Sequence, residues 1–251
     1  MKLLITIVIL LFIPFGFSED KIRIAADEWP PYSSKNLKFE GVMHRIITEA
    51  FSLSNIEVEY GYFTGARALD LVKRGRWDAT GGWTPSDERA KYFYFSDILL
   101  DETIVFFHLK SIDFDWKQWN DLQKIRIGTT IGYFYGSRFE AAKKKLNLTI
   151  NQTPKDELNF KMLLKHRIEL FPSNLDVGIY ILKTNFSTEQ FDQITYHPKP
   201  VDQGPLVLMF SKKSEKSKQL LNIFNYGLRK LKEDGKYAKF LKDSREGKYF
   251  K

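Results

Sequence analysis

The amino-acid sequence predicts an α/β protein of two lobes, joined by two crossover strands and with a ligand cleft between the lobes. After residue 20, strand-like and helix-like segments alternate, which is typical of sheets with parallel strands. The alternation forms two units of similar size. Two long apolar segments, near 103–109 and 206–210, follow the first and second units. We therefore expect these segments to be the strands that cross between the lobes.

The first unit contains three strand patterns before the first crossover: KIRIAA, IEVEYGY and RWDATGGW, at 21–26, 56–62 and 76–83. A helix pattern lies between each pair of strands. In the first helix, apolar residues recur at helical spacing, at Val42, Ile46, Ile47, Ala50 and Phe51. Thr64 is placed to cap the second helix, and Gly75 is placed to end it.

The second unit repeats this organisation. Its strand patterns lie at 124–130, 148–153, 168–171 and 193–198, and its helix patterns at 137–146, 154–166 and 174–183. Pro154 suits the start of a helix that has acidic residues in its first turn. The C-terminal segment 217–243 is strongly helical, and Gly235 is expected to divide it. One face of this segment is apolar, with Leu220, Phe224, Leu228 and Leu231.

Residues 1–18 have the pattern of a cleaved signal peptide, with one lysine, an apolar run and small residues at the end. The alternative is a membrane anchor. The apolar run is broken by Pro14 and is shorter than the roughly 20 residues that span a bilayer. We therefore expect export, a first lobe at 19–109, a second lobe at 110–203 and a return to the first lobe at 204–251.

The composition excludes several classes of function. The chain has no cysteine, which excludes disulfides, thiol catalysis and cysteine-based zinc sites, and export without cysteine favours the bacterial periplasm. The formal net charge is +8, but the lysines alternate with acidic residues and no nucleic-acid motif is present. We expect no cofactor, no metal and no nucleic-acid partner. The positive charge favours anionic ligands.

Ligands of such sheets bind beyond the carboxyl ends of strands, so the residues that follow each strand are candidates. The segment 27–32 follows the first strand, and its double proline predicts a rigid loop that fixes Trp29 and Tyr32 beside Asp27. The alternative is that these aromatic residues pack on the core. Arg67 lies early in a helix, where the helix dipole disfavours a cation. It indicates either a bound anion or a solvated surface arginine.

The segment GGWTPSDERAKYFYFSD, at 81–97, follows the third strand. Thr84 is expected to cap a short helix, with Pro85 at its first position. Free N–H groups at such a helix start accept a carboxylate. Arg89, near Trp83, adds a fork of donors that matches a carboxylate in two parallel bonds. The alternative is a surface arginine paired with a neighbouring acid.

In the second unit, GTTIGYFYG follows the strand at 124–130. A glycine-rich turn before a helix can bind an anion through its N–H groups, and Gly132, Tyr133 and Phe134 lie in this turn. The turn does not match the phosphate-loop or dinucleotide motifs. Asn174 is placed either to cap the helix that follows it or to contact a ligand.

These elements together resemble the extracytoplasmic solute-binding proteins of family 3, the polar amino-acid binders of ABC importers. The matching segments are IRIAADEWPPYS, LVKRGRWDA, TPSDERAKYFYFSD, RIELFPSN and LRKLKEDGKYAKFL, and they extend over the mature chain. The resemblance implies the periplasmic-binding-protein type II fold. It also implies a monomer that closes two lobes on a small ligand and presents it to a permease or a sensor kinase.

The resemblance assigns roles to the candidate residues. It implies that Arg89 grips the ligand carboxylate, helped by Thr84 and the backbone near Gly82. It also implies that the loop 27–32 and Trp83 line the side-chain pocket, and that the glycine turn of the second lobe closes over the ligand.

Two departures from the family pattern affect the ligand. Gly132-Tyr133-Phe134 stands where the family usually has Gly-Thr-Thr, and Asn174 stands where it usually has the aspartate that holds the α-ammonium group. An amide is a weaker partner for an ammonium than a carboxylate. We therefore expect a carboxylate-bearing ligand, either an amino acid or a related organic or aromatic acid.

The alternative is an enzyme on the same fold, because cyclohexadienyl-dehydratase-like proteins also resemble this family. Such an enzyme needs a cleft acid with a raised pKa, for which Glu28 and Glu169 are candidates. The four histidines are scattered without metal-site spacing. We therefore expect a binding protein and not an enzyme.

Overall fold

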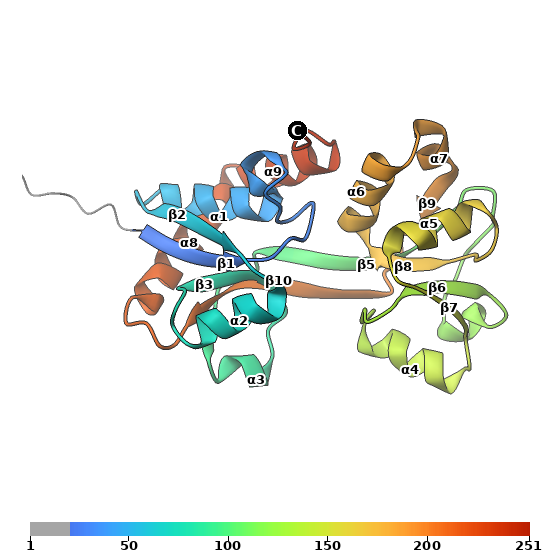
Figure 1. Ribbon diagram of the computed structural model, residues 1–251, viewed down its shortest axis with the longest axis horizontal. Helices are drawn as coiled ribbons and strands as arrows, with labels where there is room; N and C mark the ends of the chain where they lie inside the picture. The colour runs from blue at the N-terminus through green and yellow to red at the C-terminus, as the bar shows by residue number, and fades with distance from the viewer. Residues whose placement is uncertain (1–20) are drawn as a thin grey trace, which may run out of the picture.

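The computed structural model describes residues 21–251, so the predicted signal peptide at 1–18 lies outside the described residues. The predicted α/β architecture is confirmed. Two lobes are joined by the long strands β5 (Leu100–Leu109) and β10 (Asp202–Ser211), as Figure 1 shows. Over residues 21–251, the model has no helix with the length and apolar character needed to cross a membrane.

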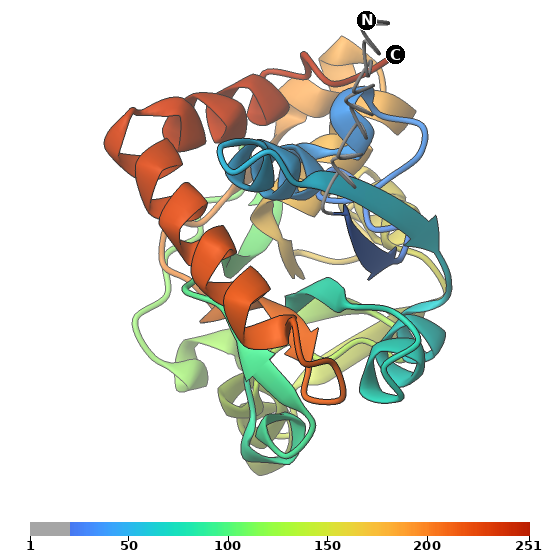
Figure 2. The same ribbon diagram turned by 90° about the vertical axis from the view of Figure 1, so that its left-hand side faces the viewer.

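The first lobe is built on a largely parallel sheet, in which β1 pairs in parallel with β2 and β3. Its elements are β1 (Lys21–Ala26), a 3-10 turn η1 (Lys38–Glu40), α1 (Val42–Ser52), β2 (Glu57–Tyr62), α2 (Gly65–Lys73), β3 (Ala79–Trp83), α3 (Asp87–Ala90) and β4 (Phe93–Phe95). The chain returns to this lobe with α8 (Ser217–Glu233) and α9 (Lys236–Arg245). In Figure 2, α8 and α9 form one edge of the lobe and change direction at Gly235, as predicted.

The second lobe contains the parallel pair β6 and β7, while β8 and β9 pair with β5. Its elements are a 3-10 turn η2 (Trp119–Leu122), β6 (Arg126–Thr130), α4 (Ser137–Lys145), β7 (Thr149–Thr153), α5 (Asp156–Leu164), β8 (Phe171–Asn174), α6 (Leu175–Asn185), α7 (Thr188–Gln193) and β9 (Ile194–Tyr196).

The two crossover strands divide their hydrogen bonds between the lobes. The first half of β10 pairs antiparallel with the first half of β5, from Asp202 opposite Ile104 to Leu206 opposite Leu100. The second half of β10 pairs with β3 and β4 in the first lobe. The second half of β5 pairs with β8 and β9 in the second lobe. The segment where β5 and β10 pair with each other therefore lies between the lobes.

Apolar faces that the sequence predicts form the core of the first lobe. All five apolar positions predicted for α1 are buried, and so are the four on α8. The two helices cross closely at Gly227, where a Cβ atom would lie 2.1 Å from the carbonyl oxygen of Ala50. Glycine is required at this crossing because backbone occupies the space of any side chain.

Neighbouring residues of β5 pack into two separate hydrophobic cores of the second lobe. Side chains alternate between the faces of a strand, so Phe106 and Phe107 point in opposite directions. Phe106 packs edge-on against Trp116, with ring centroids 5.4 Å apart, and Phe107 packs edge-on against Phe160 at 5.3 Å. The second lobe is therefore anchored to both faces of the crossover strand.

The start of α3 differs from the prediction. The helix begins at Asp87 and is capped by Ser86, whose hydroxyl accepts a hydrogen bond from the backbone N–H of Arg89. Thr84 is therefore not the cap, and Pro85 lies before the helix. Both Thr84 and Ser86 are capping residues, and the backbone of the structure places Ser86 at the required distance from Arg89.

Several other boundaries also differ. The helix after Pro154 begins at Asp156, and the strand predicted at 168–171 is β8, at Phe171–Asn174. The register against β5 explains this shift, because Phe171 pairs with Phe107 and Leu170 makes only an isolated bridge to Ile127. The strand β4 and the helix α7 are additions to the prediction.

Gly227→Ala tests the close crossing of α1 and α8. We expect it to lower the free energy of unfolding by about 1–3 kcal/mol, because the new methyl group would meet backbone that cannot rotate away. The midpoint of thermal unfolding should fall by several degrees. Tyr226→Ala, an exposed change on the same helix, is the control. An unchanged midpoint for Gly227→Ala would contradict the packing described here.

Candidate functional site

A cavity of about 220 Å³ lies between the lobes. We call it the interlobe cavity. Its wall includes Trp29 from the first lobe, Glu102 from β5, and four residues of the second lobe: Tyr133, Phe134, Asp156 and Asn174. Because both lobes and a crossover strand contribute to its wall, the cavity changes shape when the lobes move. It is the candidate ligand site.

The loop after β1 places Trp29 at the cavity and buries Tyr32. Their ring centroids lie 4.6 Å apart. The hydroxyl of Tyr32 lies 3.1 Å from both Oδ1 of Asn174 and Oδ2 of Asp176, so it bonds to the opposite lobe. Burial raises the pKa of Tyr32 well above its ordinary value, so the hydroxyl is a donor at neutral pH. Tyr32 thus bridges the lobes instead of lining the cavity.

Gly82 makes room for Trp29. Its φ is +81°, and a Cβ atom there would lie 3.4 Å from the Trp29 ring and 3.3 Å from the sulfur of Met43. A side chain at position 82 would therefore be strained and would press on the tryptophan. The glycine at the end of β3 supports the cavity wall through Trp29.

Arg89 lies outside the interlobe cavity in this structure. Its Nη1 donates to the carbonyl oxygen of Thr84, and its guanidinium carbon lies 4.9 Å from the centre of the Trp83 ring. It lines a separate hollow of the first lobe with Ser86 and Tyr92. Trp83, Thr84 and Arg89 are therefore brought together as a cluster, but the structure does not place them on the cavity wall.

Asp27 lies near Trp83 of this cluster, and Arg67 lies on α2 beside Phe63. Oδ2 of Asp27 would be 3.1 Å from a Cβ atom at Gly65, the first residue of α2, and the Trp83 ring is 3.6 Å from the same point. Burial raises the pKa of Asp27. Arg67 is exposed, with its guanidinium 5.8 Å from the centre of the Phe63 ring. Neither residue is on the wall of the interlobe cavity.

The glycine turn of the second lobe presents two aromatic rings to the cavity. Gly132 has a φ of +82°, which turns the chain out of β6. Tyr133 and Phe134 follow it and are 58% and 67% exposed, although both line the cavity. Large exposed aromatic side chains at a cavity mouth are typical of groups that a ligand covers.

Asn174 caps α6, as one of the two predictions states. Its Oδ1 accepts from the backbone N–H groups of Asp176 and Val177, at 3.0 and 3.1 Å, in addition to the hydroxyl of Tyr32. Its Nδ2 donates to Oε1 of Glu102 at 3.3 Å. The side chain therefore connects a helix cap, the opposite lobe and the cavity.

Sequence reasoning missed two acidic residues of the cavity. Burial raises the pKa of both Glu102 and Asp156. Asp156 is 8% exposed and accepts from the hydroxyl of Thr130. Glu102 had a detectable signal, since it is a carboxylate within an apolar crossover strand. Asp156 resembled an ordinary acid in the first turn of a helix, so no sequence pattern distinguished it as a site residue.

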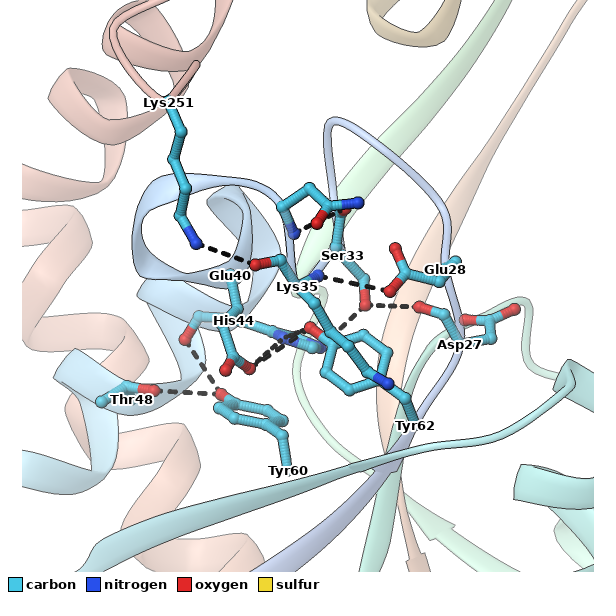
Figure 3. Close-up of polar contacts among 12 residues, drawn as sticks. Asp27, Glu28, Ser33, Lys35, Glu40, His44, Thr48, Tyr60, Tyr62 and Lys251 are labelled. Atoms are coloured by element: carbon cyan, nitrogen blue, oxygen red, sulfur yellow. Dashed lines mark hydrogen bonds and ion pairs between the residues drawn. The ribbon is translucent and has the colours of Figure 1, made fainter.

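A second polar network holds the loop that carries Trp29 (Figure 3). The ring of His44 is buried and stacks on Tyr60 with centroids 3.8 Å apart. Its Nε2 lies 3.1 Å from the hydroxyl of Ser33, which donates to the carbonyl oxygen of Asp27 at 2.6 Å. His44 therefore donates from Nε2, and helix α1 is tied to the loop after β1.

This network does not form a nucleophile. Glu40, His44 and Ser33 are linked in the order acid, histidine, serine, as in a catalytic triad. However, Ser33 is fully buried and its hydroxyl donates to a backbone carbonyl oxygen. Neither Glu28 nor Glu169, the acids proposed for an enzyme, lines the interlobe cavity. Glu169 is engaged by Arg126. Among residues 21–251, no group of three histidine or acidic residues could hold a metal ion.

The comparisons with known proteins agree with this architecture. The family described as "Bacterial extracellular solute-binding proteins, family 3" matches residues 22–244. No curated protein sequence matches the chain at a significant level. Substrate-binding domain 2 of GlnP from Lactococcus lactis, in an open conformation, is similar in structure, with a TM-score of 0.72 and 19% identity. The match covers 90% of this chain and 96% of that domain.

Two further structures have the same fold. An ancestral cationic amino-acid solute-binding protein matches with a TM-score of 0.70 and 22% identity, over 92% of this chain and 96% of its own. A histidine kinase sensor domain with similarity to periplasmic binding proteins matches with a TM-score of 0.63 and 17% identity, over 89% and 95%. At these identities the similarities demonstrate the fold, and the ligands of those proteins are theirs alone.

His44→Gln tests the network that supports the Trp29 loop. Burial lowers the pKa of His44, so the native state resists a proton that the unfolded chain accepts below about pH 6.5. The free energy of unfolding of the natural protein should therefore fall as the pH is lowered from about 7. The glutamine variant should lose this part of the dependence, which urea unfolding at several pH values measures.

The groups that surround His44 determine which variant is a suitable control for this experiment. Glu40, Asp27 and Glu28 oppose the lowering of the His44 pKa, and Tyr60 and Tyr62 pack on its ring. Thr48→Ala removes a hydroxyl that bonds to Tyr60 without removing a titrating group. It should lower stability and keep the pH slope. An identical slope in His44→Gln and the natural protein would refute the buried neutral histidine.

Proposed function

Because the chain belongs to family 3 of the bacterial extracellular solute-binding proteins, we propose that it captures a small carboxylate-bearing solute, an amino acid or a related acid, between its lobes. The observation that carries this proposal is the interlobe cavity, whose wall combines Trp29 from one lobe with Asn174 from the other. A ligand that contacts both walls favours the closed arrangement of the lobes, which is hinge closure.

We propose that β5 and β10 are the hinge, with lobe boundaries at 109/110 and 203/204. The carboxylate of the ligand would be held by Arg89, together with Thr84 and the backbone near Gly82. In this structure Arg89 is engaged by the Thr84 carbonyl and the Trp83 ring. Ligand binding through Arg89 therefore requires that this side chain exchange its partners as the lobes close.

The proposed site of action is the periplasm, after cleavage of a signal peptide at 1–18. The proposed partner is the permease of an ABC importer, which the open substrate-binding domain of GlnP supports by its fold. A sensor kinase is the alternative partner, and the similarity to a histidine kinase sensor domain supports it. Both partners require the same capture of a ligand.

An enzyme on this fold is the second candidate, and one observation favours it. Two carboxyl groups with raised pKa, the half-buried Glu102 and the buried Asp156, lie in the same cavity. Such groups occur at catalytic sites, and they also occur where a charged ligand supplies the missing partner. Incubation of each bound compound with the protein, followed by product analysis, separates the two. Turnover would establish the enzyme.

Arg89→Ala tests the carboxylate clamp. Amino acids, organic acids and aromatic acids are first screened for thermal stabilisation of the natural protein, where a ligand at about 1,000 times its dissociation constant should add about 4 kcal/mol. We expect the variant to bind the best acid about 10- to 100-fold more weakly, because hydrogen bonds to a charged group contribute about 1.5–3 kcal/mol. Isothermal titration calorimetry measures both affinities.

Arg74→Ala is the matched control, since Arg74 is an exposed arginine that follows the last residue of α2 and pairs with Asp70. It should bind the acid like the natural protein. Equal affinity in Arg89→Ala would show that the clamp is elsewhere while leaving the binding function intact. If no acid stabilises the natural protein, the proposed solute class is wrong.

A further inference from the structure

The charged side chains that line the interlobe cavity are acidic, although the protein as a whole carries a net positive charge. The chain has a formal net charge of +8. The residues that line the cavity nevertheless include two carboxyl groups, Glu102 and Asp156, and no lysine or arginine. No ion pair in the described part of the chain includes either carboxylate. The cavity therefore lacks the counter-charge that buried carboxylates ordinarily have.

Glu102 is the carboxylate that faces both lobes. It lies on β5, in the segment that pairs with β10, and its partner in the register is Gly204. A Cβ atom at Gly204 would meet nothing within 4 Å, so the space beside Glu102 is open. Burial raises the pKa of Glu102, and the neighbouring Asp202 raises it further. A cation that entered this space would relieve both effects.

Asn174 orients Glu102 but cannot itself accept a hydrogen bond from a ligand. The two lone pairs of its Oδ1 already accept from the backbone N–H groups of Asp176 and Val177, and the hydroxyl of Tyr32 lies 3.1 Å away. Its Nδ2 donates to Oε1 of Glu102 and leaves Oε2 of that carboxylate without a protein donor among the described residues. The acceptor that the cavity offers to a ligand is therefore the carboxylate of Glu102.

Aromatic side chains line the same cavity. Trp29 lies on the side of the first lobe, and Tyr133 and Phe134 lie on the side of the second. A cation is attracted to the face of an aromatic ring, most strongly to that of tryptophan. Carboxylate and aromatic groups thus favour the same kind of ligand group from different directions.

We propose that Glu102 is a specificity-determining residue of the interlobe cavity, and that it selects solutes with a protonated amine which Trp29 and Phe134 cover. The proposal rests on the proposed function, because it concerns the amine of the same solute whose carboxylate Arg89 is proposed to hold. A solute that carries only an anionic group would place a further negative charge beside Glu102 and Asp156.

Glu102→Gln tests the selection, because it removes the charge and keeps the shape of the side chain. The probes are L-amino acids and the matching 2-hydroxy acids, in which a hydroxyl replaces the amine. For the best pair, calorimetry should give the natural protein at least a tenfold preference for the amino acid, and the variant should lose most of it. Asp101→Asn removes a neighbouring charge of β5 outside the cavity and should keep the preference.

Glu102→Asp keeps the charge and changes the length of the side chain. It therefore distinguishes loss of charge from a purely structural effect of a substitution at position 102. It should retain a preference for the amino acid. The inference is overturned if the natural protein binds both members of the pair equally, or if Glu102→Gln keeps the full preference. If no member of the panel binds the natural protein, the proposed function fails, and the inference fails with it.

Agmatine, a cation without a carboxylate, separates recognition of the amine from recognition of the carboxylate. If the natural protein binds it, Glu102→Gln should weaken the binding and Arg89→Ala should not. That result would support the selection by Glu102 even if the carboxylate clamp were wrong. Binding of agmatine that Glu102→Gln leaves unchanged would overturn the inference.

Discussion

The antiparallel pairing of β5 and β10 is the constraint on which the other features of the molecule depend. In each strand, one half pairs with strands of one lobe, and the other half forms the shared segment between the lobes. The apolar residues at the outer halves fix the lobes to these strands, through Phe106 and Phe107 in one lobe and Leu208 and Phe210 in the other. A polar residue in the shared segment therefore lies where the lobes meet. Glu102 occupies that position.

The sequence predicts much of this fold because its local patterns agree with the packing. The helical spacing on α1 and α8 identifies the side chains that are buried, and the glycine at position 235 marks the boundary between α8 and α9. The start of α3 was predicted wrongly because two capping residues stand close together, and only the path of the chain after β3 selects Ser86. Local chemistry left that choice open.

The candidate site could be predicted only in part, for a different reason. Trp29, Tyr133 and Phe134 follow strands, so their place at the cavity agrees with a general rule for α/β sheets. Asp156 and Glu102 become site residues through contacts between segments that are distant in the sequence. The bond between Tyr32 and Asn174 spans 142 positions, and no periodicity in either segment indicates it. Arg89 is the reverse case, because a specific motif predicts a role in ligand binding, whereas the structure places its side chain outside the interlobe cavity.

The carboxamide of Asn174 has a consequence for how this protein could acquire a new ligand. One atom of the side chain caps a helix and bonds across the lobes, while the other atom orients Glu102. A substitution at position 174 would alter ligand choice and lobe position together, so its effects would be strongly epistatic. Within residues 21–251, Glu102 accepts a single side-chain bond. Divergence of specificity in this lineage would therefore be less constrained at position 102 than at position 174.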